Sequence, residues 1–279
     1  GSPLCGKRHR INLGGGPLNG WDMKIATWNV NSIRVRIPQL TKWLSSAAPD
    51  VVCLQETKTV DDKFPEDALA ACGYQCVHIG QKTYNGVALL ARSDINIQET
   101  ALPGDTDDEE ARYVQAQVGG ICIASLYLPN GNPVDGPKFS YKIAWMRRLV
   151  EHARRLLQHE CPVVLCGDYN VCPTDDDTYD PEGFADDALC RIESRQLFRE
   201  IINSGYTDAL RVFSRSSGLF TYWDYQAGRW NKDDGLRIDH LLLSPEAADL
   251  LCDAGVDKEP RGWTKPSDHT PAWCELRSP

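Results

Sequence analysis

The stretch CPVVLCGDYNVCP, at residues 161–173, decides both the fold and the chemistry of this sequence. Its apolar run VVLC, at residues 163–166, lies between a proline and a glycine and predicts a short strand buried on both faces. Asp168 and Asn170 follow at once, and alternation places both side chains on one side of the backbone and Tyr169 on the other. A carboxylate at the end of a strand can bind a cation or take a proton from water, and the amide beside it can hold an oxygen atom.

The rest of the chain alternates between strand-like and helix-like patterns. Strands are predicted over residues 24–30, 51–54, 74–79, 86–91, 112–118, 121–128, 219–225, 237–243 and 272–276. Helices are predicted over residues 38–47, with Pro38 in the first turn, and over 139–158 and 190–204, while 230–235 is expected to be a turn. Glycines 119 and 120 predict a hairpin between two of the strands. Buried strands that alternate with helices, interrupted by hairpins, predict an α/β fold with mixed sheets.

The candidate functional motifs are spread from residue 29 to residue 269, with no proline-, glycine- or serine-rich linker between them. They must therefore converge in space, and we expect a single domain over residues 23–279. Residues 1–22 are expected to be an N-terminal tail, either a cloning remnant or a disordered segment.

Composition limits the class of protein. The formal net charge of −9 argues against a uniformly basic surface, although local patches matter more to binding than the total. The acidic clusters at residues 105–110 and 175–187 are expected to be solvated loops. The 11 cysteines include no CxxC pair and several stand inside apolar runs, which favours reduced thiols and an intracellular compartment. No apolar run approaches membrane-spanning length, so we expect a soluble protein without a membrane partner.

Polar side chains recur where the predicted strands end. They are Asn29, Glu56, Tyr127, Asp168 with Asn170, Asp239, and Asp268 with His269. Each alone has an ordinary structural explanation, such as a hydrogen bond to a backbone amide. Together they supply the groups that metal-assisted hydrolysis of a phosphoester requires.

Seven motifs resemble, in the same order, those of the exonuclease III class of abasic-site (AP) endonucleases, within the endonuclease/exonuclease/phosphatase superfamily. They are WNVNSIR (28–34), LQETK (54–58), YNGVALL (84–90), LYLPNG (126–131), GDYN (167–170), GLRID (235–239) and SDH (267–269). The resemblance implies a four-layer α/β sandwich like that of DNase I, with two mixed β-sheets flanked by helices. It also implies hydrolysis of the phosphodiester 5′ to an abasic site, together with 3′ to 5′ exonuclease and 3′-end-cleaning activities.

The resemblance also assigns catalytic roles. Asp168, oriented by Asn170, would position or deprotonate the attacking water. Asp239 would hold His269, His269 would contact the scissile phosphate, and Tyr127 would assist near the developing charge. These roles agree with what phosphoryl transfer needs, which is an in-line water and neutralised phosphate oxygens.

By the same resemblance, the cofactor is Mg²⁺, for which Mn²⁺ would substitute. The implied metal ligands are Asn29, Glu56, Asp168, Asn170, Asp268 and His269. Glu56 would be the principal one, helped by Asn29, and Asp268 would contribute at the same site or at a second one. Asn31 departs from the pattern, because some members of the family carry an acidic residue there.

The substrate implied is duplex DNA with abasic sites or blocked 3′ ends, bound by a monomer in the bacterial cytoplasm, at the nucleoid. The implied DNA-binding residues are Arg34, Lys58, Lys82, Tyr84, Arg112 and Asn130. Tyr222, Leu236 and Ile238 would form an apolar wall around the flipped-out, base-free sugar.

Two other functions are compatible with parts of this pattern. One is a DNase I-like nuclease or a phosphatase acting on lipid or inositol phosphates, but those enzymes usually carry a histidine where this chain has Tyr127. The other is a catalytically silent nucleic-acid-binding module. Loss of activity would remove Glu56, Asp168, Asp239 or His269 first, and all four are present.

Overall fold

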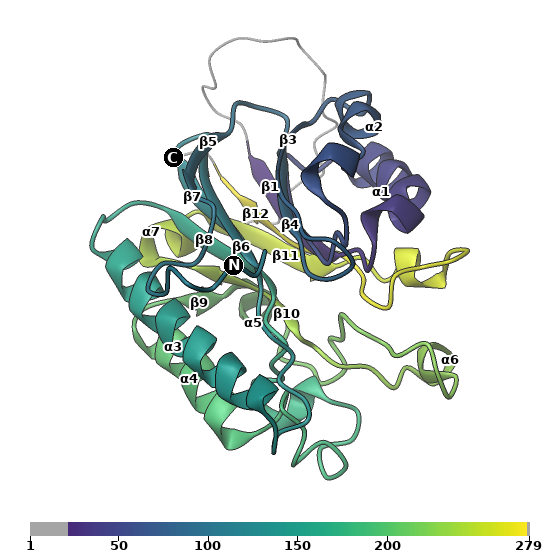
Figure 1. The fold of residues 1–279 in the computed structure, drawn as a ribbon, viewed down its shortest axis with the longest axis vertical. Helices are drawn as coiled ribbons and strands as arrows, with labels where there is room; N and C mark the ends of the chain where they lie inside the picture. The colour runs from purple at the N-terminus through teal and green to yellow at the C-terminus, as the bar shows by residue number, and fades with distance from the viewer. Residues whose placement is uncertain (1–21, 278–279) are drawn as a thin grey trace, which may run out of the picture.

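Two six-stranded β-sheets pack face to face between helices in the computed structural model, which describes residues 22–277 (Figure 1). Apart from Asp22, the expected N-terminal tail lies outside the described residues. The first sheet has the order β11-β12-β1-β2-β4-β3, with β1 Met23–Asn29, β2 Val51–Gln55, β3 Gln75–Ile79, β4 Val87–Ala91, β11 Leu251–Val256 and β12 Ala272–Leu276. The second has the order β5-β6-β7-β8-β10-β9, with β5 Asn96–Glu99, β6 Tyr113–Val118, β7 Ile121–Tyr127, β8 Val163–Asp168, β9 Thr207–Asp208 and β10 Asp239–Leu243. The predicted sandwich of two mixed sheets is confirmed.

The register of the strands brings the predicted strand ends together. Strands β7 and β8 are parallel, and Tyr127 lies opposite Asp168. Strand β10 runs antiparallel to β8 and begins at Asp239, which also lies opposite Asp168. In the other sheet β1 and β2 are parallel and end together, at Asn29 and Gln55. One edge of the sandwich therefore receives carboxylates, amides and a phenol from both sheets.

Three apolar layers hold this edge in place. The central one fills the space between the sheets and includes Ile25, Val164 and Leu241. The outer ones lie under helix α1, Ile33–Ala47, on the first sheet and under helices α3, Pro137–Leu157, and α4, Ile192–Asn203, on the second (Figure 1). Tyr169 is fully buried in the layer under α3 and α4, so the backbone alternation predicted for Asp168, Tyr169 and Asn170 is confirmed. Shorter helices complete the fold: α2 Glu66–Ala70, α5 Ala209–Phe213, α6 Arg229–Lys232, α7 Pro245–Asp249, and 3₁₀ turns at Asp61–Lys63, Asp175–Asp177 and Glu259–Gly262.

Two predicted elements were wrong. Helix α1 begins at Ile33, five residues before the predicted start, so Pro38 lies inside the helix. The backbone N–H groups of Ser32 and Ile33 donate to the carbonyls of Glu56 and Thr57, and these contacts fix the helix start from outside the segment. The segment 219–225 is not a strand, because only Tyr222 makes isolated bridges, to Leu236 and His269.

Two further expectations, a turn and a solvated loop, are also corrected by the structure. The expected turn at residues 230–235 contains most of the short helix α6. Asp177, placed by its acidic cluster in a solvated loop, is fully buried and pairs with Arg237 at 2.6 Å and with Arg211. The buried guanidinium of Arg237 needs a counter-charge, and no local sequence pattern shows which carboxylate supplies it.

Candidate active site

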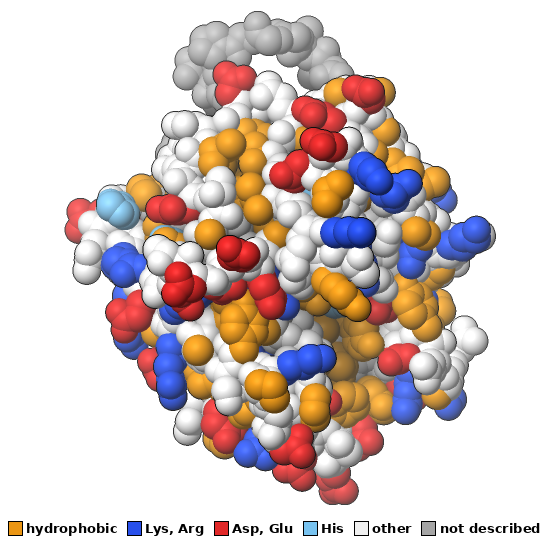
Figure 2. All heavy atoms as spheres, in the orientation of Figure 1, with side chains coloured by type: hydrophobic (Ala, Val, Ile, Leu, Met, Phe, Trp, Pro, Cys, Tyr) orange, Lys and Arg blue, Asp and Glu red, His pale blue; other side chains and the backbone are white. Residues whose placement is uncertain are grey.

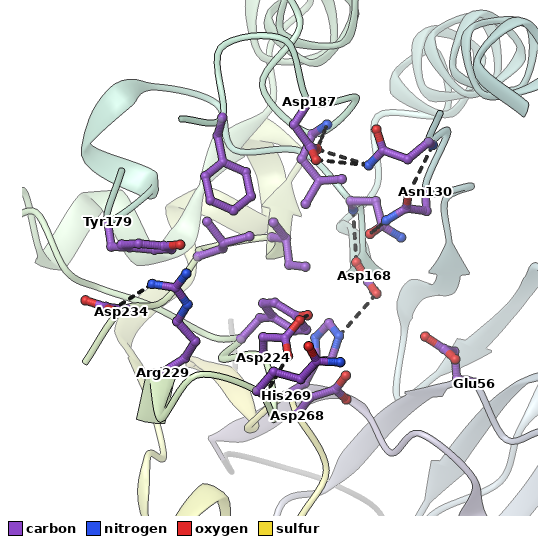
Figure 3. A pocket seen from close by; sticks show the side chains of 18 of the residues that line it. Glu56, Asn130, Asp168, Tyr179, Asp187, Asp224, Arg229, Asp234, Asp268 and His269 are labelled. Atoms are coloured by element: carbon purple, nitrogen blue, oxygen red, sulfur yellow. Dashed lines mark hydrogen bonds and ion pairs between the residues drawn. The ribbon is translucent and has the colours of Figure 1, made fainter. Parts of the chain in front are cut away.

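A cavity of about 480 Å³ opens at the sheet edge where these polar residues meet. Figure 3 shows Asp168, His269, Asp268 and Glu56 at one end of it, and Tyr179 and Arg229 toward the other. On the face seen in Figure 2, hydrophobic side chains border a hollow, with basic side chains beside it. The cavity thus joins a charged part to an apolar part.

Asn29 connects the carboxylates of the two sheets. Its Nδ2 atom donates to Glu56 Oε1 at 2.9 Å and to Asp168 Oδ2 at 2.9 Å, while its Oδ1 atom accepts the N–H of Asn31. The side chain is fully buried. Asn29 therefore holds the two acids at a fixed separation, and its role as a metal ligand stays a prediction.

A buried chain of charges runs from Asp239 through His269 to Asp168. The Nδ1 atom of His269 lies 2.8 Å from Asp239 Oδ2, and its Nε2 atom lies 3.7 Å from Asp168 Oδ2. Burial lowers the pKa of His269, but the carboxylates of Asp239 and Asp168 outweigh this and raise it to about 10. Burial also raises the pKa of Asp168, to about 7. At neutral pH a charged imidazolium thus lies between two acids, with Nε2 directed at Asp168.

Backbone contacts fix this charged chain at Asp168, one of its ends, and at His269, its middle. Asn170 donates its N–H to Asp168 Oδ1 at 2.9 Å and its Nδ2 to the carbonyl of Leu128 at 2.8 Å. Ser267 donates its hydroxyl to the carbonyl of Asn29 at 2.7 Å and accepts the N–H of His269. Asn170 thus contacts Asp168 through its backbone N–H, and the orienting role predicted for its side chain stays a prediction.

Glu56 lies beside Lys58 and close to Tyr127. Lys58 Nζ is 2.8 Å from Glu56 Oε2 and donates to Asn31 Oδ1 at 2.6 Å. Burial alone would raise the pKa of Glu56, but Lys58 and the hydrogen bond from Asn29 lower it. Burial, together with the charges of Glu56 and Asp168, raises the pKa of Tyr127 well above its usual value, so the phenol keeps its proton.

Asp268 lines the cavity beside His269 and accepts hydrogen bonds from Asn31 and Ser267, at 3.1 and 3.4 Å. Within the described residues, three acidic or histidine side chains have ligand atoms within 4.8 Å of one another: Asp168, Asp239 and His269. Asp239 Oδ1 is buried and has no hydrogen-bond partner among the described residues. The donor atoms are mostly carboxylate oxygens, which are the ligands that Mg²⁺ prefers, so the residues present fit a hard divalent cation.

The three predicted pocket residues line the apolar part of the cavity. Leu236 and Ile238 lie in one buried cluster, and Tyr222 packs against it with its ring centroid 5.0 Å from that of His269. All three border the cavity. The sequence argument that Leu236 and Ile238 face the same way is therefore confirmed, and their contact with a sugar stays a prediction.

The predicted DNA-binding residues divide into three groups. Asn130 borders the cavity and donates to Asn170 Oδ1 at 3.3 Å. Arg112, like Lys58, already has an acidic partner, with Nε 2.5 Å from Glu110 Oε2, and its guanidinium lies over the ring of Tyr127. Three of the six are exposed outside the cavity: Arg34, Lys82 and Tyr84, the last with 68% of its surface accessible.

Sequence reasoning missed half of the cavity wall. The missed residues are Asn132, Tyr179, Phe184, Asp187, Leu189, Asp224, Gln226, Ala227, Arg229 and Asp234. Most come from the loops before α4 and around α6, where neither strand nor helix periodicity exists to reveal an orientation. Also missed was Thr221, whose hydroxyl donates to Asp239 Oδ2 at 2.6 Å. Among the helices in residues 22–277, none combines the length and apolar composition needed to cross a membrane.

Comparison with known proteins agrees with this geometry. Residues 26–269 match the model of the Endonuclease/Exonuclease/phosphatase family. The chain is 30% identical over 271 residues to exodeoxyribonuclease III of Haemophilus influenzae, covering 91% of this chain and 100% of that protein. A 3′-5′ exonuclease from Neisseria meningitidis, NExo, is similar with a TM-score of 0.88 and 42% identity, over 91% of this chain and 99% of that one. An AP endonuclease from Archaeoglobus fulgidus is similar with a TM-score of 0.85 and 33% identity, over 90% and 98%.

Proposed function

Because the chain belongs to the endonuclease/exonuclease/phosphatase family and is a hydrolytic nuclease, we propose that it repairs DNA by cutting the phosphodiester 5′ to an abasic site in duplex DNA. The proposal includes 3′ to 5′ exonuclease and 3′-end-cleaning activities, because one phosphoester site serves all of them. Among its relatives, a Neisseria 3′ phosphatase was solved with a product DNA hairpin, and the Archaeoglobus protein is an AP endonuclease.

The observation that carries the proposal is the buried chain of Asp239, His269 and Asp168 opening onto a cavity with an apolar end. Acids and an imidazolium at one end suit a phosphate under attack by water. The apolar end, with Tyr222, Leu236 and Ile238, suits a sugar that has lost its base, because a base-bearing nucleotide must first unstack and then meets a wall.

Each residue of the charged end has a defined task in the proposed hydrolysis. Asp168, whose pKa of about 7 suits a general base, accepts the proton of the attacking water at a carboxylate oxygen. His269, charged and held by Asp239, donates Nε2–H to a phosphate oxygen and stabilises the charge that develops there. Tyr127 retains its proton and donates a hydrogen bond to the same phosphate.

Mg²⁺ is the proposed cofactor, replaceable by Mn²⁺. It would be held by Glu56, with Asn29, Asp168, Asn170 and Asp268 as further candidate ligands. His269, also predicted as a ligand, is kept as the phosphate contact, because an imidazolium has no nitrogen lone pair for a metal. When bound, it supplies positive charge that neutralises the phosphate and the departing oxygen.

The test is incubation with three duplexes that differ only in the lesion: an abasic-site analogue, a 3′-phosphate and an undamaged blunt end. Each is assayed with Mg²⁺, with Mn²⁺ and with excess chelator, and the product ends are identified. We expect incision 5′ to the analogue only when a divalent metal is present. Release of inorganic phosphate from the second duplex without incision of the first would limit the function to 3′-end cleaning. No reaction on any duplex would refute the proposal.

We further propose that residues 23–279 form one domain and that the protein acts as a monomer on DNA in the bacterial cytoplasm, at the nucleoid. The central core supports the single domain, because it contains residues from β1 near the start and from β12 near the end of the described chain. Light scattering of the purified protein, alone and with a short duplex, measures the stoichiometry.

A further inference from the structure

Lys142, on helix α3, carries a fully buried amine beneath the active site. A lysine is almost never fully buried unless other groups replace the water that its ammonium loses. This burial lowers the pKa of Lys142 to about 7. Because such a side chain is costly to fold into a core, what its amine contacts indicates why it is there.

All three hydrogen bonds of the Lys142 amine go to backbone carbonyls. Nζ donates to Asn130 O at 3.0 Å, to Asn170 O at 2.6 Å and to Ala188 O at 3.0 Å. An ammonium group has three N–H donors, so each finds one acceptor. Within residues 22–277, no carboxylate lies within ion-pair distance of it. Lys142 therefore connects pieces of backbone, and does not neutralise a particular acid by contact.

The three carbonyls belong to three loops that build the cavity. Asn130 lies in the loop after β7, Asn170 in the loop after β8, and Ala188 in the loop before α4. Asn130 and Asn170 border the cavity, as does Leu189, the neighbour of Ala188. One amine below the site thus holds two loops of the charged end and one loop of the apolar end.

The contact with Asn170 reaches the proposed general base. Asn170 has a backbone φ of 48°, in the left-handed region, which asparagine adopts more readily than other residues with a side chain. Lys142 donates to the carbonyl of Asn170, and the N–H of Asn170 donates to Asp168 Oδ1 at 2.9 Å. The orientation of the Asp168 carboxylate therefore depends on a backbone that Lys142 restrains.

We propose that Lys142 is a positioning residue for the hydrolysis: by holding the three carbonyls together it sets the orientation of Asp168 and the position of the Leu189 wall. This inference rests on the proposed function. The side chain is also closely enclosed, because a Cβ atom placed on Gly131 would come within 2.6 Å of Lys142 Cδ. Gly131 therefore leaves the room that the Lys142 side chain occupies.

Lys142→Met tests the amine, because methionine keeps most of the aliphatic chain and removes the three donors. Lys138→Met is the matched control: it makes the same change one turn earlier on α3, where the side chain is exposed. Both variants and the unaltered protein are assayed on the abasic-analogue and 3′-phosphate duplexes, and kcat and KM are measured separately. Thermal unfolding is recorded alongside.

We expect Lys142→Met to lower kcat by about 10- to 100-fold on both duplexes, with KM changed by less than about 3-fold, since misplacing a reacting group costs rate more than binding. Lys138→Met should stay within about 2-fold of the unaltered protein in both constants. Equal kcat in Lys142→Met and the unaltered protein would overturn the inference. Inactivity of the unaltered protein on both duplexes would instead refute the proposed function.

A second variant separates positioning from a general loss of stability. Lys142→Ala leaves a space in which added ethylammonium can place its three N–H donors near the same carbonyls. The alanine variant also replaces Lys142→Met if the methionine variant does not fold. We expect ethylammonium to raise the kcat of Lys142→Ala, and tetramethylammonium, which has no donors, to leave it unchanged. Failure of ethylammonium to raise kcat, or equal effects of the two cations, would show that Lys142 only fills the core.

Discussion

Replacement of Asp239 by asparagine removes the closer of the two carboxylates that keep His269 charged. Asp239 Oδ2 lies 2.8 Å from His269 Nδ1 and accepts the Thr221 hydroxyl at 2.6 Å, all within the protein interior. Asparagine has nearly the same shape and no charge. In the variant, Asp168, 3.7 Å from Nε2, is the nearest carboxylate left to stabilise the charged ring. The free-energy cost of burying the imidazolium is unchanged.

The raised pKa of His269 gives the order of magnitude of the stability that Asp239→Asn should remove. The pKa of His269 is about 10, against an ordinary value of 6.5, which at ~1.4 kcal/mol per pKa unit corresponds to roughly 5 kcal/mol in favour of the charged form. Two carboxylates share this stabilisation, and Asp239 is the closer one. We therefore expect Asp239→Asn to bring the pKa of His269 back toward 6.5 and to cost about 2 to 5 kcal/mol of folding free energy, similar to other broken buried ion pairs.

The sign of the pH dependence follows from the raised pKa. A histidine whose pKa is higher when folded contributes stability that is fully present below the unfolded pKa of 6.5. That contribution is lost as the pH rises through about 10. The difference in unfolding free energy between the two proteins should thus be largest near pH 6 and should shrink as the pH approaches 10.

Urea unfolding at several pH values between 6 and 10, in chelator, measures this difference, and NMR titration of the histidine rings measures the pKa directly. Thr221→Val is the control, since it removes a hydrogen bond from the same oxygen but leaves the carboxylate. It should lower stability by an amount that hardly varies with pH. An unchanged titration midpoint for His269 in Asp239→Asn, or a stability difference that does not vary with pH, would refute the reasoning.

Three further predictions concern the metal, the base and the pocket. Excess chelator should abolish cleavage without unfolding the protein, because the core is complete without a metal; full-rate cleavage in chelator would exclude the metal mechanism. Glu56→Ala should raise the Mg²⁺ concentration needed for half-maximal rate. Asp168→Asn should lower kcat by on the order of 10² to 10⁴ with little change in DNA affinity, and should combine with Asp239→Asn less than additively; near-normal incision would remove Asp168 as the base. Leu236→Ala or Tyr222→Ala should weaken abasic incision and raise cleavage at base-bearing nucleotides; a large loss of thermal stability with unchanged preference would show that they only fill the core.

Much of the charged end was predictable because each of its residues stands at the end of a strand. A short apolar run predicts a buried strand, and alternation predicts the direction of the residue at its end, as for Asp168. Asn170 lies past the strand with a φ of 48° and reaches the cavity by its own backbone turn. Whether two strand ends meet is a matter of register, which no local pattern shows. The structure supplies it, by placing Tyr127 and Asp239 opposite Asp168.

The remaining features depend on contacts between distant segments. The start of α1 is set by the carbonyls of Glu56 and Thr57, so Pro38 was a misleading signal. Tyr179 reaches the cavity from a loop without periodicity, and Arg229 from the four-residue helix α6, which is too short to show one. Lys142 immediately precedes apolar residues of a helix, and nothing local tells whether such a lysine is solvated or buried.

The cations beside the cavity offer the proposed DNA substrate little free positive charge. Lys58, Arg112 and Arg229 each already have an acidic partner within 3.0 Å. A phosphate that contacts one of these cations replaces its carboxylate partner. The binding free energy gained is therefore smaller than for a phosphate that contacts an unpaired cation. Under the proposed function we therefore expect selectivity to come less from overall attraction than from the cavity, where Asp168, the charged His269 and the apolar wall are already in place.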